Sequence, residues 1–215
     1  DLRDDLDNKL ERIPMKTDYI RYNLLYRYGG IWLDSDIIVF KDLSELVKKL
    51  EQYEYIGFGC HDGDSKCKAS MYGYPKPANW VMISRKNSLL LKYCIDKSNK
   101  LLDIHDNSYF NTHYHILGRN LIWDCIQEIK NKDKYWDYLH MSSKCIERNS
   151  KGRKYTNKVN MTMENIDTYC KNKMYFTPIY NTSPGFPKWF LDLSETEILN
   201  STLLISKHFR QALGV

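Results

Sequence analysis

Two aspartates separated by one serine, Asp34 and Asp36 around Ser35, are the residues of this sequence best suited to chemistry. Side chains two residues apart on an extended strand point to the same side, so we expect both carboxylates to converge on one point. Two adjacent buried carboxylates repel each other, and a divalent cation relieves that repulsion. Oxygen ligands favour Mg²⁺ or Mn²⁺, which leave positions open for phosphates. We therefore predict a metal site here; the alternative is a solvated turn between strands.

Apolar segments flank this triplet and must position it. Residues 31–33 form a short continuous apolar run, which is typical of a strand buried on both faces of an α/β sheet, and residues 37–40 are β-branched and strand-like. Upstream, Pro14 is expected to stop the first helix. Residues 18–28 then carry the apolar stripe of the next helix, with Thr17 as its N-cap and the glycines at 29–30 as its end. A bare Asp-x-Asp triplet occurs often by chance. The pattern is much more selective here because the triplet follows a helix, a Gly-Gly pair and an apolar strand.

Asp18 and Arg21 lie three residues apart on the predicted helix, so both side chains project from one face. Without further information, two interpretations are equally good. Asp18 can complement the positive end of the helix dipole and pair with Arg21, or both residues can contact a substrate that carries phosphates.

The rest of the chain alternates between strand-like and helical patterns. Strands are predicted at residues 55–58, 78–83, 175–180 and 203–206, and helices within residues 1–12, from Asp42 or Ser44 to about 50, at 88–102 and at 109–130. Residues 61–77 have the composition of a long surface loop, of the kind that often acts as a binding lid. A length of 215 residues fits one domain over residues 1–215.

Composition narrows the function classes. Hydrophobic residues make up 42% and charged residues 27%, as in ordinary globular proteins, and the net charge of +5 is too modest to suggest a nucleic-acid partner. No apolar run reaches the ~18 residues that a membrane span needs. Six cysteines without a CxxC pair favour reduced, buried thiols. We expect a cytoplasmic protein, although three Asn-x-Ser/Thr sequons keep the secretory-pathway lumen open.

Residues 17–36 resemble the sugar-binding region with the DXD motif of family-32 glycosyltransferases and the related capsular polysaccharide synthesis proteins. The pattern S/T-D-x-x-R-x-x-x-L-x-x-x-G-G-I-Y/W-L-D-x-D is complete in these residues. A second, weaker resemblance to the capsular group covers residues 79–88 and 109–121. Together the similar segments span about half of the chain.

This resemblance implies a GT-A fold, that is, a Rossmann-like mixed central β-sheet flanked by helices, and a metal-dependent hexosyltransferase. The expected donor is a nucleotide-diphosphate sugar, taken to be UDP-linked, the acceptor a glycan or glycoprotein, and the cofactor Mn²⁺ or Mg²⁺. Anomeric configuration is generally retained in family 32. The implied metal ligands are Asp34, Asp36 and His208; the implied substrate-binding residues are Asp18, Arg21, Gly29, Gly30, Asp34, Ser35, Asn79 and Trp80; and the implied catalytic residues are Asp18 and Asp34. His208 can equally be an ordinary histidine, and Asn79 with Trp80 can simply fill a strand.

The sequence departs from the family pattern at its start. Members usually open with a nucleotide-binding strand some tens of residues before the Asp-x-x-Arg helix, but only 17 residues precede Asp18. We therefore expect a short N-terminal nucleotide-binding portion. Two rival functions remain open: a catalytically silent carbohydrate-binding or scaffold subunit with the same fold, and a metal-dependent phosphatase or nuclease built on paired aspartates.

Overall fold

A computed structural model of the chain describes residues 2–59, 78–129, 136–140, 175–179 and 188–215. They belong to two compact units. Unit 1 contains the described parts of residues 1–33 and 44–141, and unit 2 those of residues 34–43 and 142–215. Helices and strands alternate, so the mixed α/β class expected from the sequence is confirmed. The GT-A arrangement and the single-domain organisation stay predictions.

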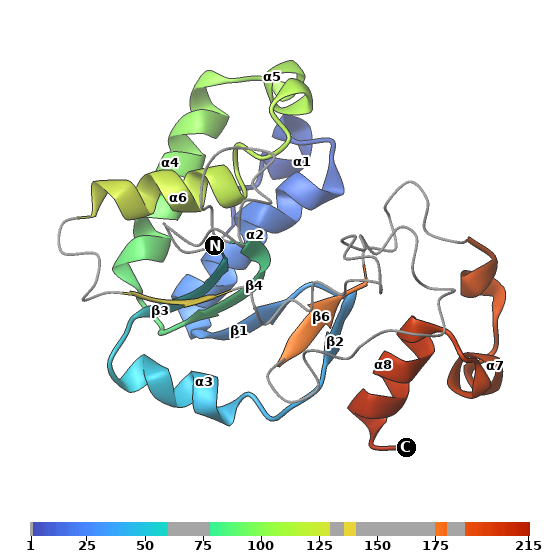
Figure 1. The fold of residues 1–215 in the computed structure, drawn as a ribbon. Helices are drawn as coiled ribbons and strands as arrows, with labels where there is room; N and C mark the ends of the chain where they lie inside the picture. Colours follow the sequence, from blue (N-terminus) through green and yellow to red (C-terminus); the bar gives the residue numbers. More distant parts are fainter. Residues whose placement is uncertain (1, 60–77, 130–135, 141–174, 180–187) are drawn as a thin grey trace, which may run out of the picture. The chain divides into compact units, whose positions relative to one another are not determined.

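Unit 1 is built on a four-stranded mixed sheet with the strand order β1-β4-β3-β5. Its strands are β1 (Gly30–Leu33), β3 (Tyr55–Gly59), β4 (Ala78–Ser84) and β5 (Trp136–His140), and its helices are α1 (Leu6–Lys9), α2 (Ile13–Tyr28), α3 (Ser44–Lys48), α4 (Leu89–Ile104), α5 (Asn107–Thr112) and α6 (Arg119–Glu128), with a 3₁₀ turn η1 (Lys49–Glu51). β4 pairs antiparallel with β1 and β3, and β3 pairs parallel with β5. Helices α2, α4 and α6 gather on one side of this sheet (Figure 1).

The main core of unit 1 lies between these three helices and the sheet. Tyr22 from α2, Met82 from β4, and Cys94 and Cys125 from α4 and α6 are fully buried in one apolar cluster. Both cysteines are free thiols, as expected from the sequence. Burial, followed by the adjacent Cys125 side chain, raises the pKa of the Cys94 thiol well above its usual value. The other four cysteines lie outside the described residues.

Helix α2 begins four to five residues earlier than the sequence suggested. Pro14 does not stop the preceding helix but occupies the first turn of α2, where its missing N–H costs nothing. Thr17 is therefore inside the helix, and its hydroxyl donates to the carbonyl oxygens of Ile13 and Pro14 at 3.1 and 2.8 Å instead of capping. The predicted end is confirmed: Gly29 has a φ of 69°, and its N–H donates to the carbonyl oxygen of Leu25 at 2.8 Å.

Strand β1 differs from the fully buried strand that we predicted. It pairs antiparallel with β4, with Gly30 opposite Ser84 and Leu33 opposite Val81, and it lies at the edge of the sheet as described. None of its four residues is fully buried. An edge position explains this, because one side of the strand has no neighbouring strand to cover it.

The predicted helix over residues 109–130 is in fact two helices, α5 and α6, separated by turns at residues 114–118. Gly118 directly precedes α6, and α5 is capped by the Asp106 side chain, which accepts from the backbone N–H of Tyr109 at 3.2 Å. Strand β5 was not predicted. Strands β3 and β4 confirm the apolar runs, and the loop at residues 61–77 lies outside the described residues.

Unit 2 contains a two-stranded antiparallel sheet of β2 (Ile37–Val39) and β6 (Phe176–Pro178), the 3₁₀ turn η5 (Lys188–Asp192), and the helices α7 (Glu195–Asn200) and α8 (Leu204–Leu213). The strand expected at residues 203–206 is wrong, because these residues begin helix α8. Ile205 and Phe209, one helical turn apart, pack in the same apolar cluster. A short apolar run does not distinguish a buried strand from the start of an amphipathic helix. No helix among the described residues is long and apolar enough to cross a membrane.

Candidate functional site

Asp18 and Arg21 form a buried ion pair on α2. Only 7% of Asp18 and 4% of Arg21 is exposed, and the Nη2 atom of Arg21 lies 3.2 Å from the Oδ1 atom of Asp18. Leucine and tyrosine side chains occupy the neighbouring buried positions of the helix. Such a pair is costly to desolvate, so it persists only where further hydrogen bonds satisfy its remaining polar atoms.

Asn79 of β4 supplies those further hydrogen bonds. Its side-chain amide donates to Asp18 Oδ1 at 2.7 Å, and its backbone carbonyl accepts from the Arg21 guanidinium. Arg21 Nε also donates to the Thr17 carbonyl at 3.2 Å, and its guanidinium lies 5.1 Å from the centre of the Trp32 ring. The structure thus joins the predicted site residues Asp18 and Arg21 to Asn79, which lies 61 positions after Asp18 in the sequence.

Gly118 closes this network, and sequence reasoning did not identify it. A Cβ atom there would lie 2.7 Å from Asp18 Oδ2 and 2.8 Å from Asn79 Nδ2, which is closer than non-bonded contacts allow. The lack of room for a Cβ atom is therefore one reason for glycine at this position. A glycine inside a stretch with a helical pattern was the available signal. We refer to Asp18, Arg21, Asn79 and Gly118 below as the buried polar network.

The two glycines after α2 have different surroundings. A Cβ atom on Gly29 would lie 2.7 Å from the backbone nitrogen of Lys86, so this glycine permits close packing of the helix end against the turn between β4 and α4. Gly30 has a φ of 100° and no atom within 4 Å of a Cβ position. The close approach at Gly29 is therefore to the protein's own backbone, whereas Gly30 faces open space. Their contact with a nucleotide stays a prediction.

Trp80 follows Asn79 on β4 and is half-buried. Neighbouring residues of a strand point to opposite faces of the sheet, so Trp80 lies on the face opposite the Asn79 amide. The structure does not gather Asn79 and Trp80 into one platform. An acceptor contact of either residue stays a prediction.

Residues 35–36 of unit 2 form a turn between Asp34 and β2, so residues 34–36 are not the extended strand that the sequence suggested. The argument that both carboxylates project to one side of a strand is therefore wrong. Asp34 and Asp36 are half-buried and Ser35 is exposed. Desolvation, and after it the negative charge of Asp34, raises the pKa of Asp36 above its usual range. The two carboxylates thus repel each other as expected, although the turn and not a strand brings them together.

Helix α8 carries His208, whose ring centre lies 5.4 Å from that of Phe40. Phe40 follows β2, and its backbone N–H donates to the Tyr175 carbonyl oxygen at 2.8 Å. Among the residues that the structure describes, no three His, Cys, Asp or Glu side chains are grouped so that they could hold a metal ion. Asp34, Asp36 and His208 are accordingly not gathered into a three-ligand cluster. The metal role of each stays a prediction.

Comparison with known proteins adds the family. A family model described as capsular polysaccharide synthesis protein matches residues 3–142. The chain belongs to this family. No curated protein and no solved structure is significantly similar to it. The matched region of this capsular polysaccharide synthesis protein contains the whole buried polar network and residues 34–36, and it ends before β6. A role in polysaccharide biosynthesis follows from the family.

Proposed function

We propose that this capsular polysaccharide synthesis protein is a metal-dependent glycosyltransferase with a GT-A fold. It would transfer a hexose from a UDP-sugar to a glycan or glycoprotein acceptor, with retention of the anomeric configuration. The observation that carries the proposal is the buried polar network. We call residues 17–36, which resemble the sugar-binding region of family-32 glycosyltransferases, the donor-site motif. The network unites Asp18 and Arg21 of this motif with Asn79, which lies in the second segment that resembles the capsular group.

The chemistry of residues 34–36 fits a divalent cation. Two carboxylates interact there, and the pKa of Asp36 is raised because its negative charge is disfavoured. A bound cation would reverse that penalty. Mg²⁺ and Mn²⁺ commonly use one or two protein carboxylates together with substrate phosphates, so a three-residue cluster is not required. Asp34 and Asp36 would hold the ion, and His208 is a further candidate ligand.

When bound, the cation would neutralise the negative charge of the diphosphate leaving group. The chain's own residues would do the positioning. Arg21 is held by Asp18, Thr17 and Asn79, so its guanidinium has a fixed direction and loses little freedom on binding. We assign Asp18 and Arg21 to the donor sugar, Gly30 and Ser35 to the donor's diphosphate side, and Asp18 and Asp34 to the catalytic carboxylates.

Thermal unfolding in the presence of UDP tests this function. With Mn²⁺, UDP should raise the melting temperature of the wild-type protein, and Asp36→Asn should remove the shift because the cation loses a charged ligand. Asp192→Asn is the matched control, since Asp192 is an exposed aspartate in the same unit. Equal stabilisation by UDP without metal, or in the Asp36→Asn variant, would show that the metal–diphosphate role is wrong.

A second measurement separates an enzyme from a silent binding subunit. The purified wild-type protein should slowly hydrolyse a UDP-sugar when Mn²⁺ is present, because water can replace the acceptor. Binding of UDP without any turnover, with an acceptor screen also negative, would favour the carbohydrate-binding or scaffold alternative.

A further inference from the structure

Unit 1 contains a half-open hollow of about 370 Å³ that the donor-site motif does not use. It is lined by the second half of α2, the turn between β4 and α4, the first half of α4, and Leu2 from the N-terminal segment. Asn23 and Arg27 line it from the exposed side of α2, whereas Asp18 and Arg21 lie on the buried side. Its volume falls within the range of about 300–1,000 Å³ that is typical of small-molecule sites.

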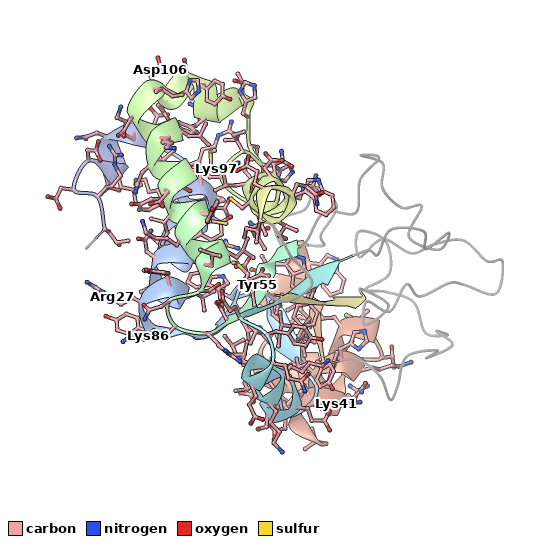
Figure 2. All side chains as sticks on the ribbon, turned by 90° about the vertical axis from the view of Figure 1, so that its left-hand side faces the viewer. Arg27, Lys41, Tyr55, Lys86, Lys97 and Asp106 are labelled. Carbon is pink, nitrogen blue, oxygen red and sulfur yellow. The ribbon has the colours of Figure 1, made fainter. Side chains whose placement is uncertain are left out.

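Three cationic side chains line this hollow, and each comes from a different element: Arg27 from α2, Lys86 from the β4–α4 turn, and Lys92 from α4. Figure 2 shows Arg27 and Lys86 at the same edge of the protein. Lys92 is partly neutralised by Asp96, whose Oδ1 atom lies 2.5 Å from its Nζ atom. No carboxylate is among the described residues that line the hollow. The hollow therefore favours an anion.

The remaining walls suit the ring of a sugar. Leu24 and Ile95 are the apolar residues of these walls, and the half-buried Tyr26 is their aromatic residue. The Asn23 amide donates to the Tyr19 carbonyl at 2.9 Å, which fixes this polar side chain at the wall. Aromatic rings with a polar tip pack against the apolar faces of sugars while their edges stay hydrated. A ligand that fits both features has an anionic group on a compact polar ring.

The walls of the hollow are held together by backbone contacts. The Asn87 N–H donates to the Tyr26 carbonyl at 2.8 Å, and Gly29 packs against the backbone nitrogen of Lys86. Asn87 adopts a φ of 60°, which turns the chain between β4 and α4. Because these contacts join the end of α2 to the turn, Arg27 and Lys86 are presented by a preformed scaffold.

We propose that this hollow, which we call the basic hollow, binds a sugar that carries a phosphate or a carboxylate group. Arg27 and Lys86 pair with the anionic group, and the wall of Leu24, Tyr26 and Ile95 packs against the sugar ring. A member of a polysaccharide synthesis family would thereby hold an anionic sugar on the side of α2 opposite the Asp18 carboxylate.

Isothermal titration calorimetry of the whole chain at low ionic strength tests the proposal. Glucose 1-phosphate and glucuronate are the anionic probes, and glucose and inorganic phosphate are the references. At least one anionic sugar should bind more tightly than both references, and added salt should weaken the binding of that sugar. The sugar that binds identifies whether phosphate or carboxylate is preferred. Anionic sugars that bind no better than inorganic phosphate would overturn the proposal.

Charge-neutral variants locate the binding. The double substitution Arg27→Gln/Lys86→Gln should raise the dissociation constant of the anionic sugar about tenfold or more, because two charge-assisted contacts are lost. The control variant Lys48→Gln/Lys100→Gln changes the net charge equally, at exposed positions outside the hollow. Its dissociation constant for the anionic sugar should stay within about twofold of the wild-type value. Equal affinity of the Arg27/Lys86 variant and the wild type would contradict the assignment.

These titrations contain neither metal nor nucleotide, so they succeed or fail independently of the proposed transferase activity. Asp36→Asn should bind the anionic sugar as the wild type does. Since Arg27 and Lys86 are exposed, neither substitution removes core packing, and circular dichroism spectra of all variants verify the fold.

Discussion

The carboxylates of the buried polar network in unit 1 and of the turn between Asp34 and Asp36 in unit 2 have opposite electrostatic surroundings. Asp18 is almost fully buried, but it has a guanidinium at 3.2 Å and an amide donor at 2.7 Å. Asp36 is only half-buried, and its pKa is raised first by desolvation and then by the negative charge of Asp34. The network compensates its charge within the protein, whereas the turn accumulates like charge.

This difference predicts unequal effects on stability. Substitutions in the network should lower the free energy of unfolding in addition to any effect on the donor sugar, because removing one partner leaves another buried and charged. Substitutions at the turn should cost little stability and act mainly on a cation.

Arg21→Ala should have the largest effect. It leaves the Asp18 carboxylate buried without its cation, which typically costs about 3–5 kcal/mol in the free energy of unfolding. Urea unfolding followed by circular dichroism measures it. Arg27→Ala is the matched control on the same helix, because Arg27 is exposed, and it should cost less than about 1 kcal/mol. Equal effects of the two substitutions would show that the buried pair does not hold the helix in place.

Gly118→Ala should follow, with a loss of about 1–3 kcal/mol, because the added methyl group overlaps Asp18 Oδ2 and Asn79 Nδ2. The same urea titration applies. Gly214→Ala serves as a control: its φ of 75° disfavours alanine, but no atom lies within 4 Å of the new Cβ, so only the conformational cost of about 1 kcal/mol remains. A Gly118→Ala protein as stable as wild type would mean that the Asp18 and Asn79 side chains move away from the added methyl group at little cost in free energy.

Asp36→Asn should give the smallest effect, with a characteristic pH dependence. The folded-state pKa of Asp36 is raised, so its contribution to stability is fully present below the unfolded-state pKa of about 3.9 and is lost as pH rises through the folded-state pKa. The variant should therefore become more stable relative to wild type with increasing pH. Urea unfolding at several pH values measures this trend.

Adding Mn²⁺ to the same titration sharpens the test. The wild-type protein should gain stability from the ion at neutral pH, and Asp36→Asn should gain less, because it has lost a charged oxygen ligand. Asp192→Asn controls for the change in net charge. A variant that is destabilised relative to wild type at high pH would contradict the repulsion between Asp34 and Asp36.

Much of the fold around the site was predictable because it is local. The end of α2 at Gly29 follows from the pair of glycines at residues 29–30, and β3 and β4 follow from short apolar runs bounded by polar residues. The errors also have local causes. Pro14 was taken as a helix stop although it suits a first turn, and the apolar residues before His208 were taken as a strand although they begin α8.

By itself, the sequence determined which of residues 17–36 match the pattern of the similar family and that the chain is a mixed α/β protein, because helix ends and apolar runs depend on neighbouring residues. Only the tertiary structure decided that Asn79 meets Asp18, that Gly118 must be small, and that β1 is an edge strand as described. It also decided that Asp34 and Asp36 interact across a turn. The contacts of Asn79 and Gly118 with Asp18 and the edge position of β1 depend on close approach between segments far apart in the chain, and such approach is set by packing, which no local pattern encodes. The turn between Asp34 and Asp36 is local, but a pattern of apolar and polar residues does not distinguish it from the end of a strand.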